Sequence, residues 1–136
     1  MPQEHSPIYT SIAGKGLPTE AAVVIAAFKP GRMFDHCLTA LLQQEGVAAF
    51  EIIVVDSSAD GTAERIQHDF PTVTVVPLEQ QTHQSIARTI GIQHTQAAYI
   101  AITDQDCVVP ADWLKRLLAH HQAGEYAAVG GAIVNG

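Results

Sequence analysis

Short apolar runs and helix-like patterns alternate along most of this chain. The runs are rich in β-branched residues and are followed by polar turns, which is typical of strands. Between them, apolar residues recur at spacings of three and four, which predicts amphipathic helices. The predicted strands cover residues 21–28, 50–55, 73–78, 99–103 and 129–134, and the predicted helices cover residues 32–45, 62–70, 84–96 and 113–121. This alternation predicts an α/β fold in three αβα layers, with a mostly parallel, Rossmann-like sheet between helices.

The length predicts one domain, because 136 residues suffice for one hydrophobic core but not for two. We expect a flexible tail over residues 1–20 and a single domain over residues 21–136, truncated after the fifth strand. The continuous apolar run over residues 99–103 predicts a strand buried on both faces. In the third helix, Ile86 and Ile90 are expected to face the sheet.

Two carboxylates, Asp104 and Asp106, follow the fourth predicted strand. Open parallel sheets bind their ligands at the carboxyl ends of the strands. Oxygen ligands suit Mg²⁺ or Mn²⁺, and a cation held in this way commonly also binds substrate phosphates. The pair therefore indicates a metal and a phosphorylated ligand. The alternative is an acidic turn, because aspartate is favoured in turns.

Other candidate residues lie at the ends of other strands. Residues 26–29 end the first strand and Asp56 ends the second, and a sheet ordered 3-2-1-4 brings both beside the acidic pair. No Gly-x-Gly-x-x-Gly follows the first strand, and no phosphate loop ends in Gly-Lys-Ser/Thr. Phosphate binding must therefore use another device, and the sequence offers carboxylates that can hold a metal.

Four stretches, in this order, resemble the N-terminal nucleotide-binding half of family 2 inverting glycosyltransferases with the GT-A fold. They are the second strand with its acidic loop, an Ala-Arg-x-x-Gly helix segment, the Asp-x-Asp strand and a Pro-x-x-Trp-Leu helix start: Glu51–Thr62, Ala87–Gly91, Tyr99–Asp106 and Pro110–Leu114. The resemblance covers about residues 22–131. The chain departs from the family at Ala26-Ala27-Phe28-Lys29, where Pro-Thr-Tyr-Asn is frequent, and at Thr89, where the family has Asn.

The resemblance implies a site for a nucleoside-diphosphate sugar, with a UDP-sugar as the expected donor. Asp56 would accept a hydrogen bond from the uracil imide, while backbone near Ala26 and Phe28 flanks the base. Arg88 would lie near the nucleobase or near the acidic pair, since its guanidinium can bond two acceptors.

The same resemblance assigns the acidic pair to the diphosphate. Asp104 would approach the ribose or the metal, and Asp106 would coordinate the Mn²⁺ or Mg²⁺ that bridges the donor diphosphate. The metal would stabilise the leaving nucleotide, and an acceptor hydroxyl would attack with inversion. In the family the catalytic base lies well beyond the Asp-x-Asp, and Glu125 is the only carboxylate after Asp112. No catalytic base is therefore assigned, and the acceptor is unknown.

Other interpretations remain open. The chain is expected to be part of a longer enzyme, and the alternative is a non-catalytic nucleotide-binding or oligomerisation module. Asp104-x-Asp106 also resembles the first motif of haloacid-dehalogenase-like phosphatases, in which the first aspartate is the nucleophile. Those enzymes need a later Ser or Thr, a later Lys and a further acidic pair, and after Val109 only Lys115 is available.

Some side chains have structural alternatives to a ligand role. Arg88 could form a structural ion pair with Asp56 or Asp69, and Asp60 is expected to cap the second helix. Cys107 has no positioned base in the sequence and is predicted to be a small packing residue. The seven histidines lack metal-ligand spacing, so no zinc site is predicted.

Charge and hydropathy limit the partners. Fourteen acidic residues against seven Lys and Arg give a net charge of −7, which argues against nucleic acid as a binding partner. No apolar run has the length of a signal peptide core or a membrane span. The two cysteines form no disulfide framework. A cytoplasmic protein is therefore expected. An unfinished sheet edge would favour a homo-oligomer.

Overall fold

The computed structural model describes residues 19–131, so the predicted tail over residues 1–20 lies almost wholly outside them. The elements are four strands and four helices in strict alternation: β1 (Ala21–Ala27), α1 (Met33–Leu42), β2 (Phe50–Asp56), α2 (Thr62–Asp69), β3 (Thr74–Pro77), α3 (Gln84–Gln93), β4 (Tyr99–Ile102) and α4 (Trp113–Gln122). No helix within residues 19–131 has the length and apolarity needed to cross a membrane.

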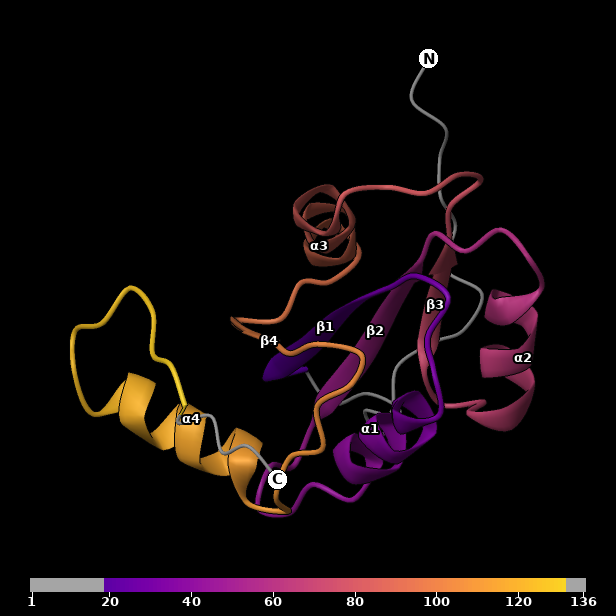
Figure 1. Cartoon of the computed structure of the whole chain (residues 1–136). Coiled ribbons are helices and arrows are strands. Elements are labelled where there is room, and N and C mark those ends of the chain that lie inside the picture. Colours follow the sequence, from indigo (N-terminus) through magenta and orange to yellow (C-terminus); the bar gives the residue numbers. More distant parts are fainter. Residues whose placement is uncertain (1–18, 132–136) are drawn as a thin grey trace.

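The four strands form one parallel sheet in the order β3-β2-β1-β4, which confirms the predicted fold. Figure 1 shows α3 on one side of this sheet and α1 on the other. The core follows the same division. Helices α1, α2 and α4 pack in one cluster against one face, and α3 packs in a second cluster against the other. The molecule therefore has the three layers that the alternation predicts.

The two central strands explain why the sequence predicts them so well. Val23 and Ile25 point into the cluster that contains Phe34 of α1, while Val24 points into the cluster that contains Ala87 of α3. Since successive side chains of a strand point to opposite faces, a strand covered on both faces needs apolar residues at every position. This requirement gives β1 its continuous apolar run and β2 the apolar run Ile52–Val55.

Three details differ from the sequence prediction. β4 is not buried on both faces: it is an edge strand in the described sheet, and Ile102 is 46% exposed. Ile86 does not face the sheet either but is 56% exposed, because α3 is rotated so that Ala87, Ile90 and Gly91 make its contact face. Of the predicted fifth strand, residues 129–131 are not in a strand, and residues 132–134 lie outside the described residues.

A buried glutamine joins α1 to the start of α4. The side chain of Gln44 donates from Nε2 to the carbonyl oxygens of Ala40 and Pro110 at 3.2 and 2.7 Å. Its Oε1 accepts from the N–H of Leu114 at 2.8 Å. That N–H lies in the first turn of the helix, where backbone donors have no intrahelical acceptor, so Gln44 satisfies a group that would otherwise be buried without a partner.

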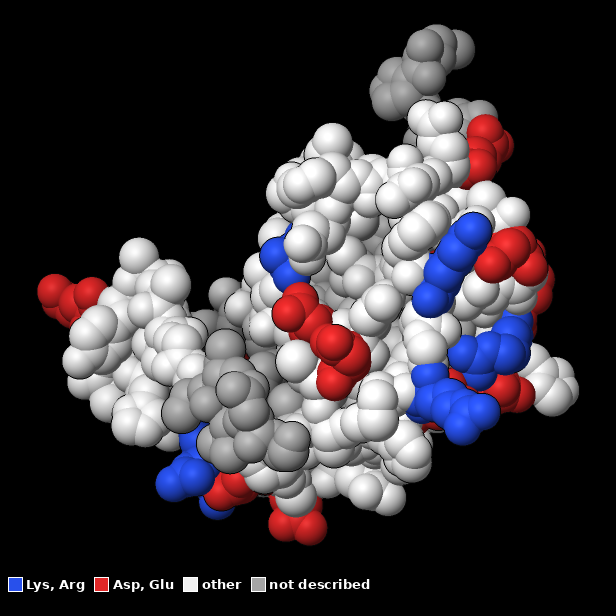
Figure 2. Space-filling view, in the orientation of Figure 1, with Lys and Arg blue, Asp and Glu red and all other residues white. Residues whose placement is uncertain are grey.

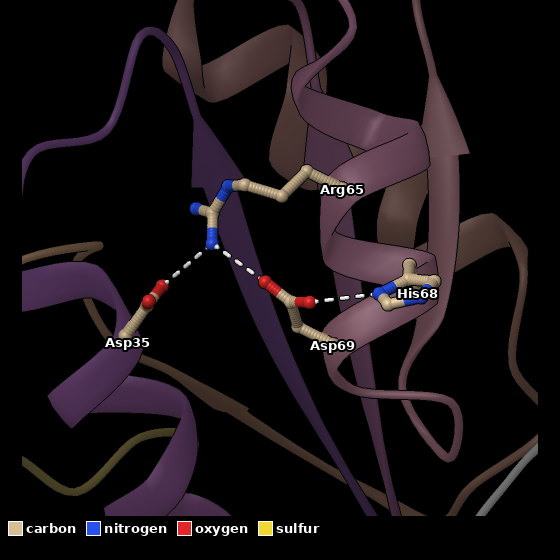
Figure 3. A network of polar contacts seen from close by, with 4 residues as sticks. All are labelled: Asp35, Arg65, His68 and Asp69. Atoms are coloured by element: carbon tan, nitrogen blue, oxygen red, sulfur yellow. Dashed lines mark hydrogen bonds and ion pairs between the residues drawn. The ribbon is translucent and has the colours of Figure 1, made fainter.

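On the opposite flank, an exposed polar network links α1 to α2 (Figure 3). Arg65 of α2 donates to Asp35 of α1 at 3.0 Å and to Asp69 at 3.3 Å, and His68 contacts Asp69 at 3.0 Å. Ion pairs this exposed contribute little stability, about 0–1 kcal/mol each. Asp69 is therefore paired with Arg65 of the same helix.

Candidate functional site

The ends of β1, β2 and β4 place three loops at one edge of the sheet. Parallel pairing sets Ala27 of β1 beside Asp56 of β2, and Val24 of β1 beside Ile102 of β4. The loops that follow these strands therefore meet at the carboxyl edge, where parallel sheets bind ligands. Figure 2 shows acidic side chains beside a basic one near the middle of this face.

Arg88 and Asp104 form the closest charged pair of the site. Nη2 of Arg88, on α3, donates to Oδ1 of Asp104 at 2.7 Å, a length typical of charge-assisted hydrogen bonds. The Arg88 side chain is 28% exposed and that of Asp104 is 59% exposed. Of the alternatives left open by the sequence, the structure thus places Arg88 at the acidic pair and not against Asp56 or Asp69.

The two aspartates of the triplet share a tight turn. The N–H of Cys107 donates to the carbonyl oxygen of Asp104 at 3.2 Å, which folds the chain back immediately after the triplet. Ligand atoms of Asp104, Asp106 and Cys107 all lie within 4.8 Å of one another. Both carboxylates are exposed, so their oxygens can reach an incoming ligand.

The two cysteines of the chain lie in different environments. Cys107 is exposed, so the prediction that it is a small packing residue is wrong; the tight turn carries it outward. Cys37 of α1 is buried, and its Sγ contacts the carbonyl oxygen of Asp104 at 3.5 Å. Burial raises the pKa of the Cys37 thiol to about 12, so this thiol stays protonated at neutral pH.

Asp56 is almost fully buried at the end of β2. Its Oδ1 accepts from the hydroxyl of Ser58 at 2.6 Å and from the N–H of Ser58 at 3.3 Å. Burial raises the pKa of this carboxyl, while the two hydrogen bonds from Ser58 act in the opposite direction. The hydroxyl of Ser58 in turn accepts from the N–H of Lys29 at 2.7 Å. A chain of hydrogen bonds therefore connects the buried carboxylate to the loop after β1.

The raised pKa of Asp56 leads to a prediction about pH. The native state binds this proton more readily than the unfolded state, so the free energy of unfolding falls as the pH rises from the unfolded pKa of about 3.9 through the folded pKa. Asp56→Asn keeps an acceptor for Ser58 and removes the buried charge. We expect the variant to be more stable than the wild type at pH 7 and the two to converge toward pH 4.

Denaturant unfolding of both proteins between pH 4 and pH 7 measures this difference. Glu79→Gln, at an exposed position, controls for the change in net charge. A variant that is less stable than the wild type at pH 7 would contradict the expectation.

Gln105, between the two aspartates, was missed by the sequence analysis. Its Oε1 accepts from the N–H of Phe28 at 2.9 Å, and its Nε2 lies 3.4 Å from the carbonyl oxygen of Phe28. One side-chain amide thus pairs with both backbone groups of a residue at the end of β1. The sequence carries no specific signal for this contact, because many polar side chains at the centre of the triplet could bond a backbone group in this way.

The remaining predicted residues lie as follows. Ala26 is half-buried near the end of β1 and packs toward α3, and Phe28 is half-buried just after that strand. Asp60 accepts from the N–H of Thr62 at 3.2 Å, although the residue at the N-cap position of α2 is Gly61. The prediction that Asp60 caps the second helix is therefore wrong by one residue, and the Asp60 carboxylate instead holds the turn that precedes the cap.

A cleft of about 1150 Å³ runs along β4 toward the triplet. Its walls come from β4, the loop after it, α4 and residues 127–131, and Arg88, Asp104 and Asp106 lie among its lining residues. The edge position of β4 leaves this space beside the acidic pair. A ligand that contacts the triplet and extends along β4 can therefore be accommodated at this edge.

Comparison with known proteins identifies the family. The sequence model described as "Glycosyl transferase family 2" matches residues 22–136, which is most of the chain. The chain belongs to glycosyl transferase family 2. The expectation drawn from the four motif-like stretches is thereby confirmed.

Two curated relatives of this family 2 chain have similar sequences. The succinoglycan biosynthesis protein ExoO of Rhizobium meliloti is 29% identical over 105 residues, which are 76% of this chain and 30% of ExoO. Glycosyltransferase AglE of Haloferax volcanii is 31% identical over 101 residues, which are 70% of this chain and 33% of AglE. The chain thus spans about a third of the length of the curated relatives it matches.

Solved structures support the fold of the family 2 domain. S. aureus TarS in complex with UDP has a TM-score of 0.62 at 18% identity, over 77% of this chain and 32% of that chain. Mannosyltransferase PcManGT of Pyrobaculum calidifontis, in complex with GDP-Man and Mn²⁺, has a TM-score of 0.65 at 21% identity, over 87% of this chain and 35% of that chain. At these identities the likeness establishes the fold alone.

Proposed function

We propose that this domain binds a nucleoside-diphosphate sugar through a divalent metal, as the donor-binding part of an inverting glycosyltransferase. The observation that carries the proposal is the meeting of a buried carboxylate, an acidic pair and an arginine at the carboxyl edge of one parallel sheet. Family membership supports the reaction class. Two structural neighbours bear UDP, or GDP-Man with Mn²⁺, which supports the ligand class.

The nucleoside end of the ligand is assigned to the loops after β1 and β2. We propose that Asp56 accepts a hydrogen bond from the imide of uracil, and that backbone near Ala26 and Phe28 flanks the ring. Asp56 is held by Ser58, and a buried carboxylate that is fixed in this way can select a base that presents an N–H. UDP is the proposed nucleotide, and GDP, whose guanine also presents a ring N–H, is the alternative that calorimetric titration separates.

The diphosphate end is assigned to the triplet. The carboxylates of Asp104 and Asp106 are exposed, and their oxygens lie close enough to act together, which fits Mn²⁺ or Mg²⁺. When bound, such an ion supplies positive charge that stabilises the departing diphosphate. Arg88 orients Asp104 through their ion pair and adds a permanent positive charge beside the phosphates.

Acceptor binding and sugar transfer are proposed for the whole protein. This chain matches about a third of the length of its curated relatives, and none of its described residues is assigned as the catalytic base. We place the nucleotide-binding domain at residues 21–136 and its action in the cytoplasm, with the acceptor left undefined.

Calorimetric titration of the 136-residue chain tests the donor-binding proposal. UDP and GDP are each titrated with Mn²⁺, with Mg²⁺ and with a chelator. We expect UDP to bind about tenfold more tightly with either metal than without it, a difference of about 1.4 kcal/mol. Tighter binding of GDP than of UDP would overturn the choice of nucleotide. If neither nucleotide shows metal-dependent binding, the proposed function is wrong.

A further inference from the structure

The segment Phe28–Lys29 is held from two sides by side chains of other loops. From the side of β4, Gln105 contacts both backbone groups of Phe28. From the side of β2, the hydroxyl of Ser58 accepts the N–H of Lys29 at 2.7 Å. Because Ser58 also donates to Asp56, an unbroken series of hydrogen bonds runs from the triplet, across the end of β1, to the buried carboxylate.

The backbone of this segment is in a conformation that needs such support. Lys29 has a φ of 41°, in the left-handed region that residues with a side chain rarely adopt. Conformations of this kind cost about 1–3 kcal/mol and persist only where the surroundings hold them. The bonds of Gln105 and Ser58 to Phe28 and Lys29 supply this support on either side of the turn.

The amide of Gln105 suits this task because it carries an acceptor oxygen and a donor nitrogen on the same carbon. Its backbone lies between the two exposed carboxylates, while its side chain turns inward to the end of β1. A change in the contact between Gln105 and Phe28 would therefore move the acidic pair relative to the loop after β1.

We infer that Gln105 is a positioning residue that sets the spacing between the nucleoside end and the metal end of the site. The inference rests on the proposed function, because it concerns a ligand that spans both ends. Such a ligand gains affinity when the two ends are held at the correct separation, whereas a ligand that occupies one end gains nothing from it.

Gln105→Met tests this inference, since methionine keeps the length of the side chain and removes both hydrogen bonds. UDP with Mg²⁺ is titrated by calorimetry. Uridine and Mg²⁺-pyrophosphate, each of which occupies one end only, are titrated by NMR. We expect the variant to bind UDP about tenfold more weakly and to bind each half-ligand within about twofold of the wild type.

Gln44→Met is the matched control, because Gln44 also bridges two segments through its amide but lies where α1 meets α4. This variant should unfold at a lower temperature and still bind UDP within about twofold of the wild type. Thermal unfolding of all three proteins separates loss of stability from loss of positioning.

The outcomes distinguish the inference from the function on which it rests. If the wild type shows metal-dependent binding of neither UDP nor GDP, the proposed function is overturned and, with it, the positioning role. If the wild type binds UDP and Gln105→Met binds it equally well, only the positioning role is overturned. An equal loss of affinity for UDP and both half-ligands also overturns it, since that result means general damage to the site.

Discussion

Replacing Asp106 with asparagine is expected to lower the affinity for UDP in the presence of Mn²⁺ by about tenfold, or about 1.4 kcal/mol, which is the whole contribution expected of the metal. Asp104 is already paired with Arg88 at 2.7 Å, so its charge is partly neutralised. In the described part of the chain, the polar contact of the Asp106 carboxylate is with Sγ of Cys107 at 3.9 Å. Asp106 is therefore the aspartate of the triplet with its charge available to a cation.

Asp106 is exposed, so its replacement tests binding without disturbing the folded core. Its removal breaks no buried contact, so the free energy of unfolding should change by less than about 0.5 kcal/mol. Asp112→Asn makes the same change of charge a few residues away and should leave UDP affinity within about twofold of the wild type. Calorimetry with and without Mn²⁺ gives both affinities. Metal-dependent UDP binding that survives in Asp106→Asn would exclude Asp106 as a metal ligand.

The fold was predictable because its strands carry a strong pattern. β1 and the Ile52–Val55 part of β2 are covered on both faces, and this burial demands the apolar runs from which the strands were predicted. The order of the strands was predicted because it places the ends of the first, second and fourth strands beside one another, and with them Asp56 and the acidic pair. The prediction that β4 is buried on both faces was wrong. An apolar run shows that a strand can be buried, but it does not show which elements cover it.

The orientation of α3 shows where patterning loses information. Ile86 and Ile90 lie four residues apart, and this spacing predicts that both face the sheet. The helix instead turns Ala87 and Gly91 inward, since small side chains let it approach the strands closely. Size, rather than hydrophobicity, decides this contact, and a hydropathy pattern does not register size.

The site was predictable only as far as its charged groups. Asp56, Asp104 and Asp106 follow strands and are visible in the sequence as breaks in apolar runs. Ser58 and Gln105 act through hydrogen bonds to backbone groups, which any polar residue with suitable geometry can make. Such contacts leave no spacing or composition signal, so the links between the loops emerged only with the structure.

Replacing Gly91 with alanine is expected to lower the free energy of unfolding by about 2 kcal/mol. A Cβ at this position would lie 2.6 Å from Cγ1 of Val24 and 3.2 Å from Cγ2 of Val55. Both valines are fully buried in strands and have restricted χ1 angles, so α3 must move away from the sheet. Overpacking of this kind costs about 3 kcal/mol, and the better helix propensity of alanine offsets about 1 kcal/mol.

A double-mutant cycle with Val24→Ala shows whether this contact is the cause. Val24→Ala removes the methyl group that the new Cβ would contact. It should therefore lower the free energy of unfolding by about 1 kcal/mol less in the Gly91→Ala background than in the wild type. Gly31→Ala, where a Cβ meets no atom within 4 Å, should change stability by less than about 0.5 kcal/mol. Additive losses in the cycle would mean that α3 tolerates the extra atom in another way. Since Arg88 lies about one turn before Gly91 on the same helix, a displacement of α3 that relieves this contact is also expected to lengthen the 2.7 Å contact between Arg88 and Asp104.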